Sequence, residues 1–157
     1  MENKEYKILF VCLGNICRSP IGECVMQKKA EKNGLTNIKV DSAGLISYHT
    51  GEQPDSRMIS AGAKKGYFLN HRARKISEQD FYDFDLIIGM DKENVIKLKN
   101  ICPSPNLRNK IRPASDYFTY ENGFDCVPDP YYGSQKDFYK VIELVEDVCD
   151  GIIKELI

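Results

Sequence analysis

The sequence predicts an α/β fold in which helices cover both faces of a parallel β-sheet. Two nearly unbroken apolar segments, Tyr6–Val11 and Asp85–Met90, have the pattern of strands that are buried on both faces. Segments with helical periodicity follow both, and this alternation is typical of βα units. In such sheets ligands bind beyond the carboxyl ends of the strands, so the loop after the first strand is the first candidate for a site.

The first helix has recognisable start and stop signals. Ser19 has the character of an N-cap, and Pro20 of a first helical residue. Glu23 would then lie in the first turn, where a carboxylate interacts favourably with the helix dipole. The Asn33-Gly34 pair predicts the end of the helix.

The next elements are shorter. Ile38–Asp41 has the pattern of a second strand, and the polar residues 42–53 that follow it predict a loop. Pro54–Lys65 is expected to form another helix, because Pro at its start and Gly66 after its end are typical helix boundaries.

The second half of the chain begins with the Asp85–Met90 strand, and Asp91–Lys99 is expected to form a short helix after it. Residues 100–133 contain five of the seven prolines, so we expect irregular structure with a last short strand at Lys110–Arg112. Ser134 and Asp137 have the spacing of a capping box. An amphipathic pattern then predicts one long helix to the C-terminus.

Composition excludes several classes of protein. The 157 residues suit one domain, spanning 1–157, and a net charge of −1 argues against nucleic-acid binding. No apolar run approaches the ~20 residues of a membrane span. The six cysteines include no Cys-x-x-Cys pair. We therefore expect reduced thiols in a cytoplasmic protein, and neither a structural zinc site nor disulfide staples.

The loop after the first strand carries residues suited to an anion. A turn from strand to helix directs backbone N–H groups into one concavity, at the positive end of the helix dipole. Gly14 allows close approach of a ligand, and Asn15 tolerates positive φ. Arg18 offers a planar fork that matches two phosphate oxygens. Residues 12–18, here named the phosphate-binding loop, thus suit a tetrahedral dianion.

Cys12 begins this loop, where the field that holds phosphate also favours a thiolate nucleophile. The alternative is a buried cysteine in a turn that only packs, because Cys-x5-Arg is common by chance. A phenolate leaving group departs faster when it is protonated, so the partner of Cys12 should be a carboxylic acid. Asp129, followed by Pro130 and two tyrosines, is the candidate, although an isolated Asp-Pro pair usually marks a turn.

Two separated motifs resemble the low-molecular-weight protein tyrosine phosphatases: Val11–Pro20 and Asp129–Gly133. Asp41-Ser-Ala43 and His71–Arg74 match further family segments in the right order. The resemblance implies a four-stranded parallel sheet flanked by helices. It also implies hydrolysis of phosphotyrosine and small aryl phosphates through a cysteinyl-phosphate intermediate, without metal or other cofactor.

The resemblance also implies residue roles. Cys12 would be the nucleophile, Arg18 would bind the phosphoryl oxygens, and Asp129 would serve as general acid and base. The phosphate would contact the N–H groups of Leu13, Gly14, Asn15, Ile16, Cys17 and Arg18. Ser19 would donate a hydrogen bond to the Cys12 sulfur, and a supporting network would comprise Asn15, Ser42, His71 and Glu23.

The same resemblance implies a deep slot for the phenyl ring, lined by Leu13, Tyr48, His49, Tyr131 and Tyr132. Cys17 could join Cys12 in a reversible disulfide that protects the nucleophile. The expected partners are phosphotyrosine-containing proteins and phosphate- or sulfate-like anions. We expect a monomer or a weak dimer.

Two departures from the family pattern stand out. Gly22 replaces a helix-forming residue in the first helix, which should cost roughly 0.5–1 kcal/mol. Leu45–Thr50 also differs, at the rim of the expected slot.

Other functions remain as alternatives. Arsenate reductase on the same fold needs further cysteines, and Phe81–Met90 contains none. A phosphopeptide-binding module without catalysis would lack the nucleophile or the acid, and both are present. A P-loop nucleotide hydrolase is excluded, because no Gly-Lys-Ser/Thr motif occurs.

Overall fold

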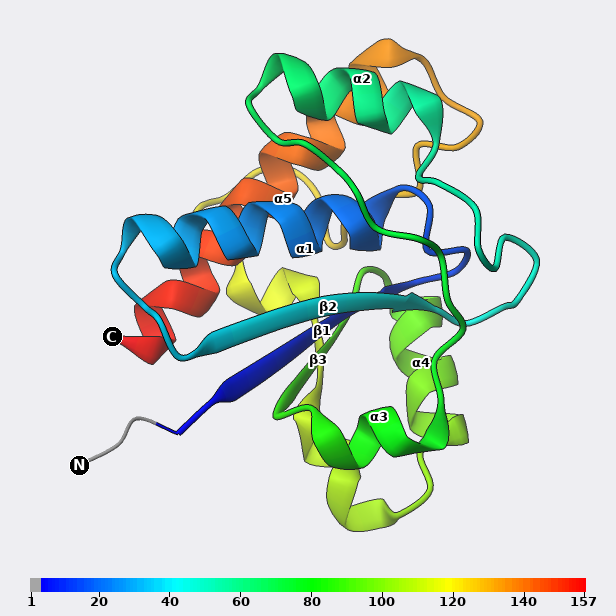
Figure 1. The fold of residues 1–157 in the computed structure, drawn as a ribbon, viewed down its shortest axis with the longest axis vertical. Coiled ribbons are helices and arrows are strands. Elements are labelled where there is room, and N and C mark those ends of the chain that lie inside the picture. The colour runs from blue at the N-terminus through cyan, green and yellow to red at the C-terminus, as the bar shows by residue number, and fades with distance from the viewer. Residues whose placement is uncertain (1–3) are drawn as a thin grey trace.

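The computed structural model describes residues 4–157 and contains a four-stranded, entirely parallel sheet with the strand order β2-β1-β3-β4 (Figure 1). Helices cover both faces of the sheet, as the sequence predicts. The strands are β1 (Tyr6–Cys12), β2 (Ile38–Gly44), β3 (Leu86–Gly89) and β4 (Ile111–Pro113). The helices are α1 (Arg18–Lys32), α2 (Ser56–Lys64), α3 (Glu78–Asp83), α4 (Lys92–Ile101) and α5 (Gln135–Leu156).

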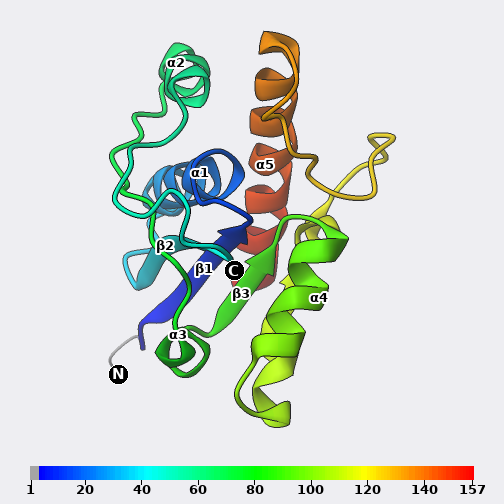
Figure 2. The ribbon, with the colours of Figure 1, turned by 90° about the vertical axis from the view of Figure 1, so that its right-hand side faces the viewer.

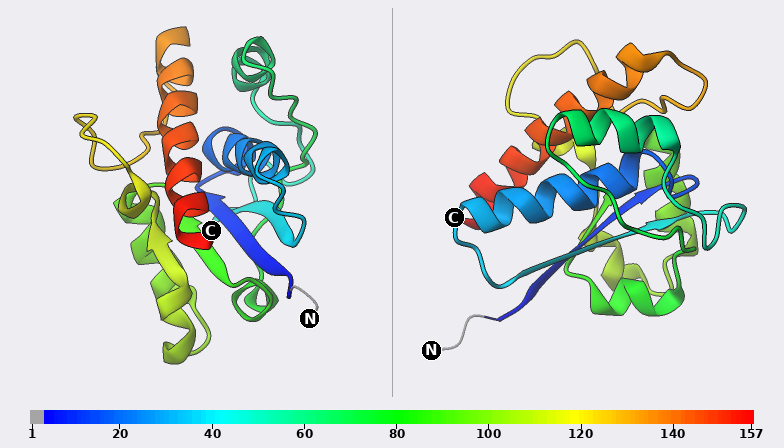
Figure 3. Two further views of the ribbon diagram at one scale, coloured as in Figure 1. Left: turned by 90° about the vertical axis from the view of Figure 1, so that its left-hand side faces the viewer. Right: turned by 45° about the horizontal axis from the view of Figure 1, so that its top comes forward.

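The helices form two layers. Helices α1, α2 and α5 lie on one side of the sheet, with α1 and α5 side by side, and α3 and α4 lie on the other (Figures 2 and 3). The side chains of strand β1 contribute to the hydrophobic cores under both helix layers. Ile8 and Phe10 belong to the core beneath α1 and α5, whereas Leu9 and Val11 belong to the core beneath α3 and α4. This two-sided burial explains why the β1 sequence is apolar without alternation.

The start of α1 differs from its prediction. The N-cap is Cys17 and the helix begins at Arg18, so the prediction of Ser19 as N-cap is wrong. The Ser19 side chain instead faces the sulfur of Cys12. Glu23 consequently lies beyond the first turn, where its carboxylate contacts side chains rather than the helix N-terminus. Tertiary contacts have overridden the local capping signals.

Other boundaries shift for identifiable reasons. Strand β2 continues to Gly44, because its pairing with β1 runs on to Cys12; residues 42–44 are therefore not loop. Helix α2 begins at Ser56 with Asp55 as its N-cap. Strand β4 lies one residue later than predicted, and two 3₁₀-helices, Pro105–Lys110 and Ala114–Tyr117, interrupt the stretch expected to be irregular.

Helix α3 was not predicted, because six residues are too few for a clear apolar period. Its start is fixed locally, since the Ser77 N–H donates to the Asp80 carboxylate over 2.7 Å. The predicted capping box of α5 is confirmed: the Ser134 N–H donates to Asp137 over 2.7 Å. Within residues 4–157 no helix is both long and apolar enough to cross a membrane.

The strand order places the site. Strand β2 lies on one side of β1, and the next strand along the chain, β3, lies on the other side. The order in which strands are added to the sheet therefore reverses between β1 and β3. The loops that follow these two strands therefore diverge and leave a crevice at the carboxyl edge of the sheet. The phosphate-binding loop occupies this position, beside the turn from β3 into α4.

We predict that Gly22→Ala destabilises the protein, although alanine is the better helix former. A Cβ at position 22 would lie 2.8 Å from a ring carbon of the fully buried Phe10 and 3.0 Å from the Met90 methyl group. Overpacking of this kind costs about 1–3 kcal/mol, which exceeds the helix-propensity gain of about 1 kcal/mol. The urea unfolding midpoint measures the balance. A midpoint at or above that of the wild type would mean that Gly22 is not required for packing.

Candidate active site

The phosphate-binding loop turns sharply from β1 into α1. Cys12 is the last residue of β1, and Arg18 is the first of α1. Asn15 adopts φ = 58°, and it is the one non-glycine residue between positions 4 and 157 with positive φ. The end of β2 supports the loop closely, since a Cβ on Gly44 would lie 3.1 Å from both the Asn15 nitrogen and the Gly14 carbonyl carbon.

The loop presents free backbone donors. Among the hydrogen bonds formed by residues 4–157, none has the backbone N–H of residues 13–17 as its donor. Backbone N–H groups that lack a protein acceptor are uncommon, and several in one turn at a helix N-terminus make a binding site for an oxyanion. The geometry thus suits a bound phosphate.

The buried side chain of Asn15 uses all of its hydrogen-bonding capacity. Its Nδ2 donates to the Ser19 hydroxyl over 2.8 Å and to the Ser42 hydroxyl over 3.0 Å. Its Oδ1 accepts from the Arg74 N–H over 2.9 Å and from His71 Nε2 over 2.8 Å. A backbone N–H can only donate, so this contact fixes the amide orientation and requires His71 Nε2 to carry a hydrogen.

These bonds set the direction of the Ser19 hydroxyl, which lies 3.1 Å from the sulfur of Cys12. Its oxygen already accepts a hydrogen from Asn15, so its own hydrogen is free to point at the sulfur. The other acceptor in reach, the Ala43 carbonyl, is more distant at 3.4 Å. A hydroxyl that donates to a sulfur anion stabilises the thiolate and, later, its departure from phosphorus.

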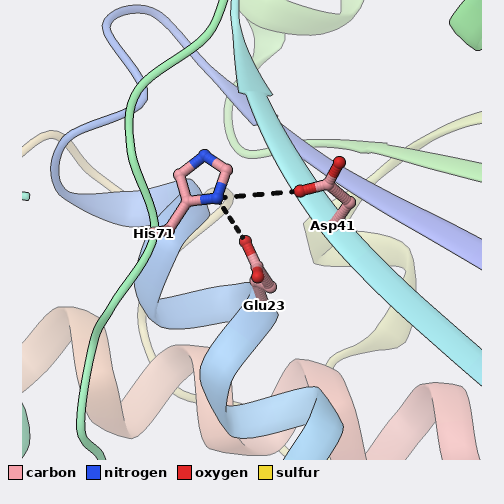
Figure 4. A group of neighbouring side chains, drawn as sticks. All are labelled: Glu23, Asp41 and His71. Atoms are coloured by element: carbon pink, nitrogen blue, oxygen red, sulfur yellow. Dashed lines mark ion pairs between the residues drawn. The ribbon is translucent and has the colours of Figure 1, made fainter. Parts of the chain in front are cut away.

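Behind Asn15 lies a cluster of Glu23 from α1, Asp41 from β2 and His71 from the segment between α2 and α3 (Figure 4). His71 Nδ1 lies 3.2 Å from Glu23 Oε1 and 3.7 Å from Asp41 Oδ1. Burial raises the pKa of Glu23 to about 7 and lowers the pKa of His71. Burial thus favours the neutral form of both Glu23 and His71. Ser42 links the cluster to Asn15 by donating to Glu23 Oε1 over 2.7 Å.

Arg18 is held in place from the neighbouring strand. Its guanidinium is almost fully buried and donates to Asp91 over 2.6 Å and to the Val127 carbonyl over 3.1 Å. Asp129 lies 3.7 Å from the same guanidinium and is half exposed. Asp91 was missed in the sequence, although its position directly after a buried strand was a usable signal. It is also the N-cap of α4, where it accepts from the Asn94 N–H.

A cavity of about 320 Å³ opens above the loop. Its lining includes the five predicted slot residues, Leu13, Tyr48, His49, Tyr131 and Tyr132, together with Cys12, Arg18 and Asp129. Tyr131 and Tyr132 pack edge to face, with their ring centroids 5.0 Å apart. Tyr132 is 96% exposed and contributes only to the rim. Ile16 and Ile46 add apolar lining that the sequence did not predict.

Cys17 lies in the same loop, and its thiol is buried. Burial raises the pKa of Cys17 well above its usual range, with Asp55 acting in the same direction. Its environment therefore favours a neutral thiol and gives it no support as a nucleophile. All six cysteines are free thiols in the structure.

Comparison with known proteins identifies the family. The model of the family "Low molecular weight phosphotyrosine protein phosphatase" matches residues 7–157. A low molecular weight protein-tyrosine-phosphatase of Streptomyces coelicolor is 37% identical over 94% of this chain and 92% of its own. The low molecular weight phosphotyrosine protein phosphatase 1 of Drosophila melanogaster is 40% identical, with 95% and 96% covered.

Solved structures of similar proteins support the same family assignment. A protein tyrosine phosphatase from Entamoeba histolytica, with Hepes in its active site, superimposes with a TM-score of 0.93 at 44% identity, covering 97% of each chain. A structure described as a Drosophila arginine phosphatase gives a TM-score of 0.89 at 33% identity, with 96% and 97% covered. The family match over nearly the whole chain, this fold and a free cysteine at the base of the loop agree: the chain belongs to the low molecular weight phosphotyrosine protein phosphatases.

Proposed function

We propose that residues 1–157 form one phosphatase domain that hydrolyses phosphotyrosine and small aryl phosphates through a phosphorylated Cys12. The observation that carries the proposal is the placement of the Cys12 sulfur. It lies 3.1 Å from the Ser19 hydroxyl, at the base of a loop whose backbone donors are free, with Arg18 and Asp129 lining the same cavity. A nucleophile, an oxyanion cradle and an acid thus face one space.

In the first step the Cys12 thiolate attacks phosphorus, and a sulfur–phosphorus bond forms as the bond from phosphorus to the tyrosyl oxygen breaks. The electron pair leaves with that oxygen, which takes a proton from the Asp129 carboxyl group. Arg18 and the N–H groups of residues 13–18 stabilise the charge on the three equatorial oxygens. Asp91 keeps the Arg18 fork oriented, because its carboxylate holds one guanidinium nitrogen at 2.6 Å.

In the second step water attacks the phosphocysteine. Asp129, now a carboxylate, accepts a proton from the water as the new oxygen–phosphorus bond forms. The sulfur–phosphorus bond breaks and returns the electron pair to Cys12. Ser19 stabilises the departing thiolate, since its hydroxyl lies 3.1 Å from the sulfur and can donate its hydrogen to the sulfur anion. The product is inorganic phosphate, and the cycle needs no metal.

The lining of the cavity favours a flat aromatic group. Leu13, Ile16, Ile46 and Tyr131 give it apolar walls, and Asp129 is the one carboxylate among the lining residues described. A phosphoserine is too short to contact these walls while its phosphate lies in the loop. The similar Drosophila structure is described as an arginine phosphatase, so phosphoarginine is the competing substrate against which phosphotyrosine should be compared. Its guanidinium would gain little from this apolar lining.

The proposed activity also implies which partners the protein has, where it acts and how it is regulated. The protein partners are phosphotyrosine-containing proteins, and the cytoplasm is the proposed location because free cysteines persist in a reducing compartment. We also propose that Cys12, oxidised by a peroxide to the sulfenic acid, condenses with the thiol of Cys17 in the same loop, which forms a disulfide and releases water. Such a disulfide would protect the nucleophile from irreversible oxidation.

The decisive experiment is hydrolysis of a phosphotyrosine peptide in the presence of EDTA, with phosphoserine and phosphoarginine peptides of the same sequence as comparisons. We expect turnover of the phosphotyrosine peptide alone. Cys12→Ser should retain below about 1% of this activity, because the nucleophile is lost. It should still bind inorganic phosphate, since Arg18 and the loop remain. Substantial activity of Cys12→Ser, or a preference for another peptide, would contradict the proposal.

A second prediction separates the acid from the nucleophile. Asp129→Asn should slow hydrolysis of phosphotyrosine by about 10²–10⁴-fold, the usual range for general acid–base catalysis. With p-nitrophenyl phosphate the leaving group needs no proton, so phosphoenzyme formation should be affected much less. Single-turnover measurements on both substrates test this. Equal slowing of the two would mean that Asp129 positions the loop and another group supplies the proton.

A further inference from the structure

We propose that Glu23, Asp41 and His71 form a binding site for Zn²⁺, behind the phosphate-binding loop and outside the catalytic cavity (Figure 4). Among residues 4–157 this is the one group that brings three potential ligands together, with all ligand atoms within 4.8 Å of one another. His71 Nδ1 lies 3.2 Å from Glu23 Oε1 and 3.7 Å from Asp41 Oδ1. Ligand atoms around a tetrahedral zinc, with bonds of about 2.0–2.2 Å, are separated by about 3.3–3.6 Å.

The tautomer of His71 also favours a cation at this position. Its Nε2 carries a hydrogen, because that atom donates to the Asn15 oxygen, whose identity the Arg74 N–H fixes. The lone pair of neutral His71 therefore lies on Nδ1, directed at two carboxylates. Three electron-rich atoms that face one another repel, and a cation between them, either a shared proton or a metal ion, removes this repulsion.

Each proposed ligand also has an outer partner of the kind that zinc sites use. His71 donates its other N–H to Asn15, which would fix the ring for metal binding through Nδ1. Glu23 Oε1 accepts from the Ser42 hydroxyl over 2.7 Å, and Asp41 Oδ1 accepts from the Ser42 N–H over 2.8 Å. These contacts hold the side chains in place without using all of their lone pairs.

Access and charge favour a metal ion as well. The side chains of His71 and Glu23 are 12% and 16% exposed, and that of Asp41 is 39% exposed, so an ion can enter from the Asp41 side. One imidazole and two carboxylates favour Zn²⁺ over Mg²⁺ or Ca²⁺, which prefer oxygen ligands alone. Arg74 forms ion pairs with both Asp41, at 3.0 Å, and Asp80. When Asp41 turns to the metal, Arg74 would therefore remain paired with Asp80.

The site connects to the phosphate-binding loop through Asn15, which bonds to His71 Nε2 and to the Ser42 hydroxyl that donates to Glu23. When Zn²⁺ replaces the proton shared between Nδ1 and the carboxylates, His71 binds the ion as a neutral imidazole and still donates to Asn15 through Nε2. Bound zinc would therefore preserve the Asn15 contacts while it releases the shared proton to solvent. The ion would act as a structural ligand of the loop and take no part in phosphoryl transfer.

The test measures Zn²⁺ binding to the full chain by calorimetry, in a Cys12→Ser background that removes the reactive thiolate as a competing ligand. We expect one ion per chain. Asp41→Asn and Glu23→Gln should each weaken binding by at least about tenfold, since the loss even of an outer-shell partner weakens metal sites by that factor. Glu52→Gln is the matched control, because the His49–Glu52 pair, 3.2 Å apart, lacks a third ligand. It should bind Zn²⁺ as the background does.

Co²⁺ provides an independent measurement. In the Cys12→Ser background it should give the visible bands of a tetrahedral site without a sulfur-to-cobalt charge-transfer band, and Asp41→Asn should abolish them. Circular dichroism and inorganic phosphate binding verify that each variant is folded. If Glu23→Gln fails to fold, the zinc affinity of Asp41→Asn decides the test, because the Asp41 side chain is more exposed. Zinc affinity unchanged in Asp41→Asn, or a charge-transfer band that assigns the ion to the remaining cysteines, would overturn the proposal.

Discussion

The amide of Asn15 is one buried group on which most of the active site depends. Its two donors orient the hydroxyls of Ser19 and Ser42, and its oxygen receives the N–H groups of His71 and Arg74. The contacts come from β2, from α1 and from the segment that follows α2. They hold a positive φ, which asparagine tolerates better than most residues with a Cβ. The shape of the loop is therefore a consequence of tertiary structure, and the free loop would not keep it.

Strand order supplies the second constraint. Because the strand order reverses between the parallel strands β1 and β3, Asp91, which follows β3, lies against Arg18, a residue that follows β1. Arg18 is thus fixed before any ligand arrives, with Asp91 on one nitrogen and Asp129 on the other side of the fork. Preorganisation of this kind removes the free energy that ordering a long side chain would otherwise cost at binding. The fold, rather than the loop sequence, aims the guanidinium.

Local sequence predicted the elements and the chemistry of the loop, but it could not predict relations between distant segments. The two-sided burial of β1 was readable from its unbroken apolar run, and the capping box of α5 from Ser134 and Asp137. The prediction that Ser19 is the N-cap of α1 was wrong, because the hydroxyl that typically caps a helix contacts the Cys12 sulfur instead. The contacts of Asp91 with Arg18 and of Asp41 with His71 join positions that are far apart in the chain, whereas the family resemblance alone placed Glu23 and His71 in one network. Gly22 looked like a helix weakness, whereas it permits close packing on Phe10.

The most direct test of the role of Asn15 compares Asn15→Gly with Asn15→Ala in the Cys12→Ser background, with inorganic phosphate affinity as the measurement. Glycine adopts the positive φ freely but supplies no amide, so the two variants separate backbone strain from side-chain bonding. Removing the amide leaves buried partners unpaired, at about 1–3 kcal/mol each. We predict that both variants lose at least about tenfold in phosphate affinity. Affinity unchanged in Asn15→Gly would contradict the account, since backbone conformation alone would then suffice to build the loop.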